Sequence, residues 1–202
     1  MGIHEVNKAV FLDRDGVINE LVFNPKTGEY ESPHTVEEFK IFPQVNECLS
    51  QIQDAGYFLF LISNQPSYAK GKANLDNIKE IHARLDDFFK SNSIVFKEYY
   101  YCYHHPEGIV PEYAQKCQCR KPGNYFILEA ERVYGLDLNK SYLIGDCDTD
   151  IECGIRSGMS TILVDNPHSI KKRHGKVKAN YEVHNLTEAK DIILSKEVIA
   201  KL

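Results

Sequence analysis

Two pairs of carboxylates follow short apolar segments of the chain. Asp13 and Asp15 come directly after the run at residues 9–12, in FLDRDGVIN, and Asp146 and Asp150 follow the run at 142–144, in LIGDCDTD. Carboxylates this close repel one another unless a cation or a shared proton relieves them. Oxygen ligands of this kind suit Mg2+. The two segments together predict a magnesium site, whereas singly they fit ordinary turn residues or, for Asp150, a residue near a helix N-terminus.

Further polar residues follow another apolar segment. Ser63 and Asn64 come after the run FLFLI at residues 58–62, and their small hydrogen-bonding side chains could hold phosphoryl oxygens. In isolation they would equally fit a polar turn with a helix cap. Lys121, in CRKPG, offers a compact cation directly before a predicted helix. A lone Arg-Lys pair is more often solvated surface, so its weight depends on the other segments.

A stretch of loop-like sequence at residues 101–123 carries three of the six cysteines. Cys102 and His104 form one close pair, and Cys117 and Cys119 form another. Three thiolates and an imidazole suit a tetrahedral Zn2+ whose four positions are all taken by protein, which makes a structural site. A Cys-x-Cys pair bridges poorly, and a thioredoxin-type site would need Cys-x-x-Cys. Another metal, a redox use and free thiols remain as alternatives.

The composition is that of an ordinary globular protein. The 202 residues carry a formal charge of -5, 43% are hydrophobic and 26% are charged, which argues against a nucleic-acid partner. No apolar run is long enough to span a membrane. The first sixteen residues, MGIHEVNKAVFLDRDG, lack the apolar core of a signal peptide. We expect a cytoplasmic protein with reduced thiols, no membrane partner and a monomeric state.

Strand-like and helix-like patterns alternate along the chain. Apolar runs predict strands near residues 9–12, 58–62, 99–103, 142–144, 161–164 and 181–183. Apolar residues at helical spacing predict helices at 45–55, 75–88, 126–134 and 151–157, and from 187 onward. This alternation predicts a Rossmann-like α/β fold with a mostly parallel sheet, in one domain over residues 1–202 with a zinc loop at 102–122. Ligands of such sheets bind beyond the carboxyl ends of the strands.

The four polar motifs, in this order, resemble the haloacid dehalogenase (HAD) superfamily of phosphotransferases. They are Asp-x-Asp-Gly, Ser-Asn, a lysine before a helix and Gly-Asp-x-x-x-Asp, and they span about two-thirds of the chain, from Asp13 to Asp150. Within the superfamily, FLDRDGVIN, SNQ and the Cys-x-His…Cys-x-Cys-Arg-Lys-Pro block are similar to the histidinol-phosphate and D-glycero-D-manno-heptose 1,7-bisphosphate phosphatase branch. The short spacing between motifs leaves no room for a large cap domain. We expect residues 21–35, the loop after Ser63 and the zinc loop to cover the site.

The resemblance implies a role for each residue of the motifs. Asp13 would be the nucleophile that forms an aspartyl-phosphate, and Asp15 would protonate the leaving oxygen and later deprotonate water. Mg2+ would bind Asp13, Asp146 and the main-chain carbonyl of Asp15. Ser63 and Lys121 would hold the phosphoryl oxygens, and Asp150 would support Lys121 or a water on the metal.

The resemblance also implies a phosphorylated sugar as substrate, with Asn64, Gln65 and Arg120 in substrate binding. The same resemblance favours His104 over His105 as the zinc ligand. Two departures concern specificity: Pro66-Ser67 stands where the heptose enzymes tend to have Ser-Gly, and Cys147 stands where they tend to have lysine. We expect hydrolysis of the 7-phosphate of D-glycero-D-manno-heptose 1,7-bisphosphate. Histidinol phosphate, another small phosphate ester, an oligonucleotide end and a non-catalytic zinc-stabilised binding module remain as alternatives.

Overall fold

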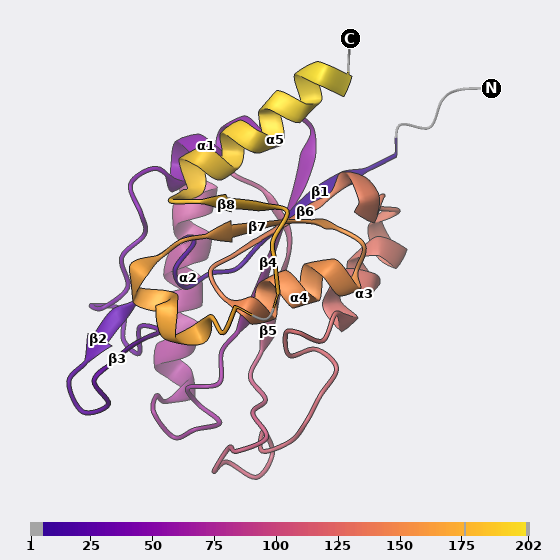
Figure 1. Cartoon of the computed structure of the whole chain (residues 1–202). Helices are drawn as coiled ribbons and strands as arrows, with labels where there is room; N and C mark the ends of the chain where they lie inside the picture. The colour runs from indigo at the N-terminus through magenta and orange to yellow at the C-terminus, as the bar shows by residue number, and fades with distance from the viewer. Residues whose placement is uncertain (1–5, 176, 201–202) are drawn as a thin grey trace.

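The computed structural model describes residues 6–175 and 177–200. Its main sheet has six strands in the order β5-β4-β1-β6-β7-β8, and every neighbouring pair is parallel (Figure 1). These strands are β5 (Phe96–Cys102), β4 (Tyr57–Asn64), β1 (Lys8–Leu12), β6 (Tyr142–Gly145), β7 (Ser160–Val164) and β8 (Tyr181–Val183). The predicted α/β fold with a mostly parallel sheet is confirmed.

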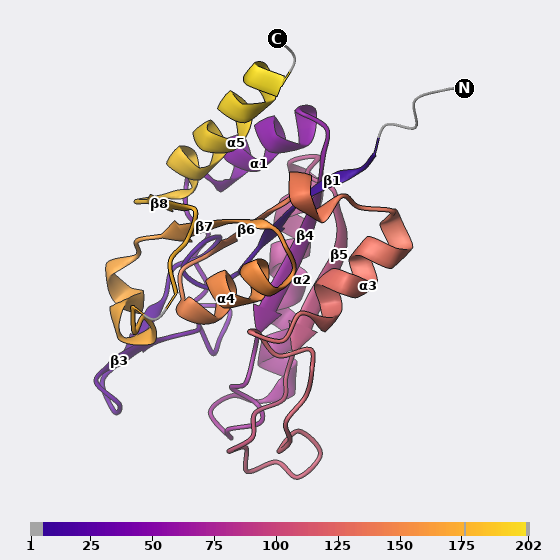
Figure 2. The same cartoon turned by 45° about the vertical axis from the view of Figure 1, so that its right-hand side comes forward.

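Helices cover both faces of this sheet (Figures 1 and 2). Helices α1 (Val45–Asp54), α2 (Leu75–Ser91) and α5 (Leu186–Ala200) pack on one face, and α3 (Tyr125–Tyr134) and α4 (Asp148–Arg156) on the other. Successive side chains of a strand point to opposite faces. In β1, Val10 and Leu12 therefore join the first cluster and Ala9 and Phe11 the second. This two-sided burial makes the strands apolar throughout, as expected for a parallel sheet.

Two predicted boundaries move in the structure. Strand β4 extends to Asn64, so the polar residues expected just after the strand are its last two. Helix α4 begins at Asp148 rather than at residue 151, because the Asp150 carboxylate accepts a hydrogen bond from the backbone N–H of Cys147 (3.0 Å) and caps the first turn. Asp150 thus serves the helix terminus as well as the site.

A small hairpin occupies the predicted covering segment at residues 21–35. Strands β2 (Val22–Asn24) and β3 (Glu29–Glu31) pair antiparallel outside the main sheet. Glu31 pairs with Lys72 of the loop after β4 (2.6 Å), and the Tyr30 ring stacks on His168 with 3.7 Å between ring centroids. His168 belongs to the 3-10 helix η2 (Pro167–Lys172), which the sequence pattern did not predict. The hairpin therefore bridges two loops beyond the carboxyl ends of the strands.

The cysteine-rich segment after β5 is a long loop without helix or strand at residues 103–124. Figures 1 and 2 show it projecting from the end of the sheet, beyond β5 and α2. Its middle is fixed to the loop after β4, since the Ala69 carbonyl accepts hydrogen bonds from the backbone N–H groups of Ile109 (2.7 Å) and Val110 (3.2 Å). Two of the three predicted covering segments are thus joined to each other.

Among the described residues, no helix has the length and apolar character needed to cross a membrane. Residues 1–5, which form part of the segment in which we expect no signal peptide, lie outside the described part of the chain.

His82 of α2 gives the fold a measurable dependence on pH. Its ring stacks on Tyr101 (3.6 Å between centroids), and burial, together with the nearby Arg14 charge, lowers the pKa of His82 to about 3. In the unfolded chain the pKa of His82 is near 6.5, so below this pH the unfolded chain binds a proton that the folded chain does not bind. The free energy of unfolding is therefore unaffected by His82 above pH 6.5 and falls as the pH is lowered below it. At pH 5 this effect lowers the free energy of unfolding by about 1–2 kcal/mol, and we expect His82→Phe to abolish that decrease.

The measurement is urea unfolding of wild type and His82→Phe at pH 7.5 and pH 5. The quantity of interest is the change in their stability difference between the two pH values, because any packing effect of phenylalanine cancels in it. An identical dependence on pH in both proteins would show that His82 does not remain neutral in the folded chain.

Candidate active site

The loop after β1 brings the first pair of carboxylates against the second. The backbone N–H of Asp13 donates to the Ile144 carbonyl of β6 (2.9 Å), which fixes the two strand ends side by side. Gly16 then turns with φ of +88°, and a Cβ at this position would overlap the Asp146 carboxylate. Only glycine combines this backbone conformation with so close an approach. The glycine of Asp-x-Asp-Gly therefore lets the two acidic segments meet, as the sequence pattern predicts.

Lys121 lies between two of these carboxylates. Its side chain is buried, its residue is only 2% exposed, and its Nζ lies 2.9 Å from Asp13 Oδ1 and 2.6 Å from Asp150 Oδ1. The same ammonium donates to the Ile62 carbonyl of β4 (2.7 Å). Burial would lower the pKa of Lys121, but the two carboxylates outweigh it and raise the pKa, so the ammonium stays charged.

Asn64 fixes the backbone that carries this lysine. Its Nδ2 donates to the Lys121 carbonyl (3.1 Å), and its Oδ1 accepts from the Lys121 backbone N–H (3.0 Å). A side-chain amide that forms both of these hydrogen bonds to one residue sets its position and its orientation together. Asn64 was predicted as a substrate-binding residue; it lines the cavity described below, and both its polar atoms are engaged by Lys121.

Asp15 is held in a network that the sequence pattern did not predict. Arg14 is 0% exposed and donates through Nη2 to both oxygens of Asp15 (2.9 and 3.1 Å). Asn19 and Gln65 donate to the same carboxylate (2.9 and 2.6 Å). Burial alone would raise the pKa of Asp15, but the guanidinium and these hydrogen bonds lower it. The only signal of this network in the sequence was the position of Arg14, a charged residue close after a buried strand and flanked by Asp13 and Asp15.

Several of the predicted site residues line one cavity of about 340 Å3 at the carboxyl ends of the strands. They are Asp13, Asp15, Asn64, Arg120, Lys121 and Asp150. Ser63, Gln65 and Asp146 lie buried beside it, with Ser63 accepting a hydrogen bond from Gln65 Nε2 (3.0 Å). The cavity wall also includes the hairpin residues 29–32 and, from the loop after β4, Ser67, Lys70 and Lys72, which lie in two of the segments expected to cover the site. Sequence reasoning missed Thr149 and Lys172.

The carboxylates of the site carry more negative charge than the protein balances. Burial, opposed by Lys121 and reinforced by Asp150 and Asp15, raises the pKa of Asp13 to about 6. Burial and the Asp13 charge likewise raise the pKa of Asp146. The Cys147 thiol and the Ser169 hydroxyl both donate to the Asp146 carboxylate, so its oxygens are oriented by neutral donors. Buried, mutually repelling oxygen ligands of this kind fit a divalent cation such as Mg2+.

The cysteine loop gathers its four predicted ligands in one place. The Sγ atoms of Cys102, Cys117 and Cys119 lie 3.3–3.5 Å apart. His104 Nδ1 lies 3.9 Å from Cys102 Sγ and 3.6 Å from Cys119 Sγ. Tetrahedral Zn2+ with bonds of about 2.3 Å to sulfur would place its ligands about 3.8 Å apart, so the four side chains fit this ion.

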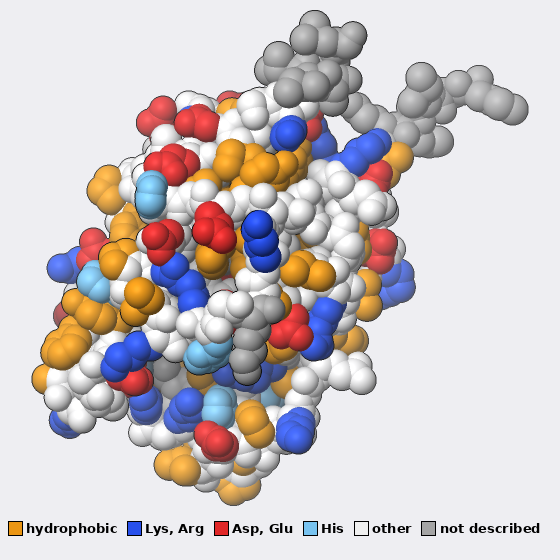
Figure 3. Space-filling view, viewed as in Figure 1, with side chains coloured by type: hydrophobic (Ala, Val, Ile, Leu, Met, Phe, Trp, Pro, Cys, Tyr) orange, Lys and Arg blue, Asp and Glu red, His pale blue; other side chains and the backbone are white. Residues whose placement is uncertain are grey.

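The cluster adjoins the cationic side of the cavity. Arg120 directly follows Cys119, and its Nη1 donates to the His104 carbonyl (3.3 Å). Burial lowers the pKa of Lys70, and the charges of Lys72 and Arg120 lower it further, which indicates that three cations crowd together here. Figure 3 shows basic side chains grouped on the lower half of the molecule, where the loops beyond the strands lie. This side of the cavity suits an anionic group.

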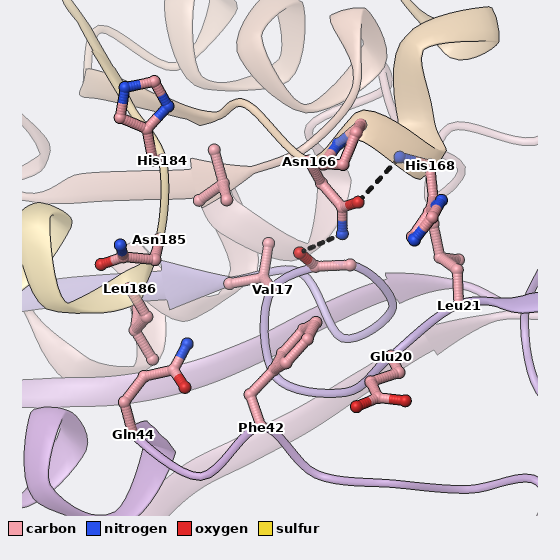
Figure 4. A pocket seen from close by; sticks show the side chains of 13 residues that line it. Val17, Glu20, Leu21, Phe42, Gln44, Asn166, His168, His184, Asn185 and Leu186 are labelled. Carbon is pink, nitrogen blue, oxygen red and sulfur yellow. Dashed lines mark hydrogen bonds between the residues drawn. The ribbon is translucent and has the colours of Figure 1, made fainter.

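A second cavity, of about 400 Å3, has Gly16 and Val17 in its wall (Figure 4). Its walls are mixed, with Val17, Phe42 and Leu186 among polar side chains. Asn166 lines this second cavity, and its Nδ2 donates to the Gly16 carbonyl (3.1 Å). None of the predicted site residues lines this second cavity. The predicted chemistry therefore belongs to the cavity that contains Asp13.

Comparison with known proteins agrees with the resemblance to the HAD superfamily that the sequence motifs indicate. A HAD-hydrolase-like family model matches residues 118–189. The D-glycero-alpha-D-manno-heptose-1,7-bisphosphate 7-phosphatase of Photorhabdus laumondii is 33% identical over 156 residues, which cover 77% of this chain and 81% of that protein. The D-glycero-beta-D-manno-heptose-1,7-bisphosphate 7-phosphatase of Pasteurella multocida is 31% identical over 189 residues, covering 93% and 97%.

A solved structure supports the fold. The D,D-heptose 1,7-bisphosphate phosphatase of B. bronchiseptica, complexed with magnesium and phosphate, superposes with a TM-score of 0.75 at 21% identity, over 94% of this chain and 99% of that one. Sequence motifs, site geometry and the two curated relatives agree, and the chain belongs to the HAD-like phosphatases, in the branch of the D-glycero-D-manno-heptose-1,7-bisphosphate 7-phosphatases.

Proposed function

We propose that this protein is a Mg2+-dependent phosphatase that removes the 7-phosphate of D-glycero-D-manno-heptose 1,7-bisphosphate through an aspartyl-phosphate on Asp13. The observation that carries the proposal is the position of Asp13, which lines the cavity with its Oδ1 held 2.9 Å from the buried Lys121 ammonium. The names of the relatives support the substrate, and the magnesium and phosphate bound to the B. bronchiseptica enzyme support the cation.

In the first step an oxygen of Asp13 attacks phosphorus, the bond from phosphorus to the sugar oxygen breaks, and Asp15 in its protonated form gives its proton to the departing sugar oxygen. Lys121 holds Asp13 in place and is close enough to share its charge with the phosphoryl oxygens as negative charge moves onto them. Asp13, Asp146 and the main-chain carbonyl of Asp15 would hold Mg2+, which supplies charge neutralisation for the approach of a dianion to these carboxylates. Ser63, at the end of β4, completes the predicted set of phosphoryl-binding groups.

In the second step water attacks the aspartyl-phosphate and needs a base. Asp15 suits this role, because Arg14, Asn19 and Gln65 hold it as a carboxylate that lines the cavity. The same partners oppose the protonation of Asp15. To act as the acid that protonates the sugar oxygen, Asp15 must therefore first bind a proton despite the nearby Arg14 charge. We therefore propose that Gln65 acts through Asp15 rather than on the substrate, since its amide is buried and bonded to Asp15 and Ser63.

The cationic side of the cavity supports a bisphosphate as substrate. Lys70 and Arg120 line it, and neither has a carboxylate within 4 Å in the described part of the chain. Cations crowded together without a carboxylate favour an anionic ligand, here the phosphate that is not removed. A non-catalytic binding module would not need the buried Asp13–Lys121–Asp150 arrangement as well.

The four ligands of the cysteine loop would hold a structural Zn2+. The ion would supply no chemistry to the reaction, because protein atoms take all four positions. Cys119 precedes Arg120 and Lys121 directly, so anchoring this cysteine fixes where both cations lie. We propose that the zinc loop sets substrate selection through Arg120.

Asp13→Asn should lower turnover by about 1000-fold or more, because an amide oxygen is a poor nucleophile and cannot form the aspartyl-phosphate. Phosphate release from the heptose bisphosphate measures it. The matched control is Asp87→Asn, an exposed aspartate on α2, which should keep wild-type activity. Circular dichroism would establish that both variants are folded, and a turnover near that of wild type in folded Asp13→Asn would refute the nucleophile.

A substrate panel should separate the proposed function from its alternatives. The panel contains both heptose bisphosphate anomers, because the relatives divide between them, together with histidinol phosphate, other sugar phosphates and a 3′-phosphorylated oligonucleotide. We expect the highest kcat/KM with one heptose bisphosphate anomer and activity only with Mg2+ present. Preference for histidinol phosphate would overturn the substrate, and no hydrolysis of any ester would favour the binding module.

Cys117→Ser should remove zinc and weaken substrate selection more than bond breaking. Metal analysis should find about one zinc per wild-type chain and much less in the variant. KM for the heptose bisphosphate should rise about tenfold, as expected for the loss of one well-placed charged contact, while activity on a small aryl phosphate changes less. Zinc loss with unchanged affinity for the bisphosphate would contradict the proposed role of the loop.

A further inference from the structure

Lys172 is a cation of the cavity that lies outside all four sequence motifs. It is the last residue of η2 (Pro167–Lys172), and it lines the cavity together with Asp13, Cys147 and Asp150. Partial desolvation at the rim of the cavity would lower the pKa of Lys172, but the nearby Asp146, Cys147, Asp15 and Asp13, in that order, outweigh it and raise the pKa. Ser169 of the same helix donates to Asp146, so Lys172 lies beside the part of the cavity that holds Asp13, Asp146 and Asp150, here called the reacting half.

Lys172 differs in its contacts from the two basic residues beside it. Lys171 and Lys172 are both exposed, but Lys171 pairs with Glu29 of the hairpin (3.5 Å), and Arg173 pairs with Asp165. Within the described part of the chain, no carboxylate lies within 4 Å of Lys172 Nζ, and the ammonium forms no hydrogen bond to protein. Of three successive cations, only Lys172 lines the cavity, and it does so with its donors free.

The position of η2 is fixed by contacts on three sides. The Ser169 hydroxyl donates to Asp146, and the Asn166 side chain both donates to the Gly16 carbonyl (3.1 Å) and accepts from the His168 backbone N–H (2.9 Å). The Tyr30 ring of the hairpin stacks on His168. Helix η2 is therefore attached to both acidic segments and to the hairpin, which holds Lys172 at the rim of the reacting half.

The charges of this half of the cavity require such a residue. Arg14 and Lys121 balance two of the four carboxylates Asp13, Asp15, Asp146 and Asp150, and a divalent cation would balance the other two. A phosphate monoester, which enters as a dianion, would then find no net positive charge in the site. Cys147 adds none, because its thiol donates to Asp146 Oδ1 (2.9 Å) and so keeps its proton. Lys172 is the remaining cation on this side.

We propose that Lys172 is a phosphoryl-binding residue that donates to the nonbridging oxygens of the phosphate under attack by Asp13. Position 147, directly after Asp146, is a cysteine in this chain and carries no positive charge. Lys172 supplies that charge from η2 instead. Lys70 and Arg120 remain for the other phosphate. The inference rests on the proposed function, because it requires that the cavity binds a phosphate ester.

The test compares Lys172→Met with the matched control Lys171→Met, Lys172→Arg and the double variant Cys147→Lys/Lys172→Met. Three quantities are measured: kcat/KM for the heptose bisphosphate, kcat/KM for a small aryl phosphate, and the dissociation constant of inorganic phosphate in the presence of Mg2+. A charge-assisted hydrogen bond to phosphate corresponds to about a 10- to 100-fold effect. For Lys172→Met we expect both kcat/KM values to fall by this factor and the dissociation constant of inorganic phosphate to rise by it.

The other variants separate binding from structure. Lys171→Met should match wild type, Lys172→Arg should recover most of the loss, and a lysine at position 147 should recover part of it from a different element, which a purely structural role for Lys172 would not allow. A loss confined to the bisphosphate would overturn the proposal, because Lys172 would then contact the other phosphate. Equal affinity of wild type and Lys172→Met for inorganic phosphate would overturn it also. An inactive wild type would instead refute the proposed function.

Discussion

The buried ion pairs of Lys121 with Asp13 and Asp150 are the interaction on which the rest of the site depends. Each partner comes from a different part of the chain: the loop after β1, the loop after β5 and the first turn of α4. Charges without partners cost several kcal/mol to bury, so none of the three could occupy this position alone. The fold must therefore deliver all three together, and the contacts around them do so. Asn64 clamps the Lys121 backbone, and Asp150 is tied to the backbone of Cys147.

This arrangement also explains why the two proposed metal sites would have different relations to the reaction. The carboxylates Asp13 and Asp146 repel each other in a buried space, and under the proposed function a hard cation would relieve this repulsion where the phosphate binds. The thiolates and imidazole of the cysteine loop would saturate a soft cation, which leaves it nothing to offer a substrate. The loop still matters to the reaction, because Cys119 lies next to Arg120 and two residues from Lys121.

The sequence predicted what depends on local pattern and on the parallel sheet. Runs of apolar residues located the strands, and the rule that ligands bind at their carboxyl ends was enough to place Asp13, Asp146 and Asp150 at one edge of the sheet. The sequence did not predict the partners of Arg14, since Gln65 lies in the loop after β4, or the hairpin β2–β3, whose short strands pair outside the main sheet. Lys172 had no motif at all. Contacts between loops distant in sequence leave no periodic pattern, so only the three-dimensional fold places these residues.

The cavity divides into two halves that are built differently, and this division bears on specificity. The reacting half rests on strand ends and on buried ion pairs, where a small displacement would leave a charge without a partner. The other half consists of Lys70 and Arg120 on loops that are held by the Ala69 contacts to the cysteine loop and by the Lys72–Glu31 pair. Loops tolerate changes in side chain and length far better than buried strand ends do. A change of substrate can therefore come from the loop half while the aspartate chemistry stays the same. Helix η2, which carries Lys172, belongs to the reacting half, because Ser169 bonds it to Asp146.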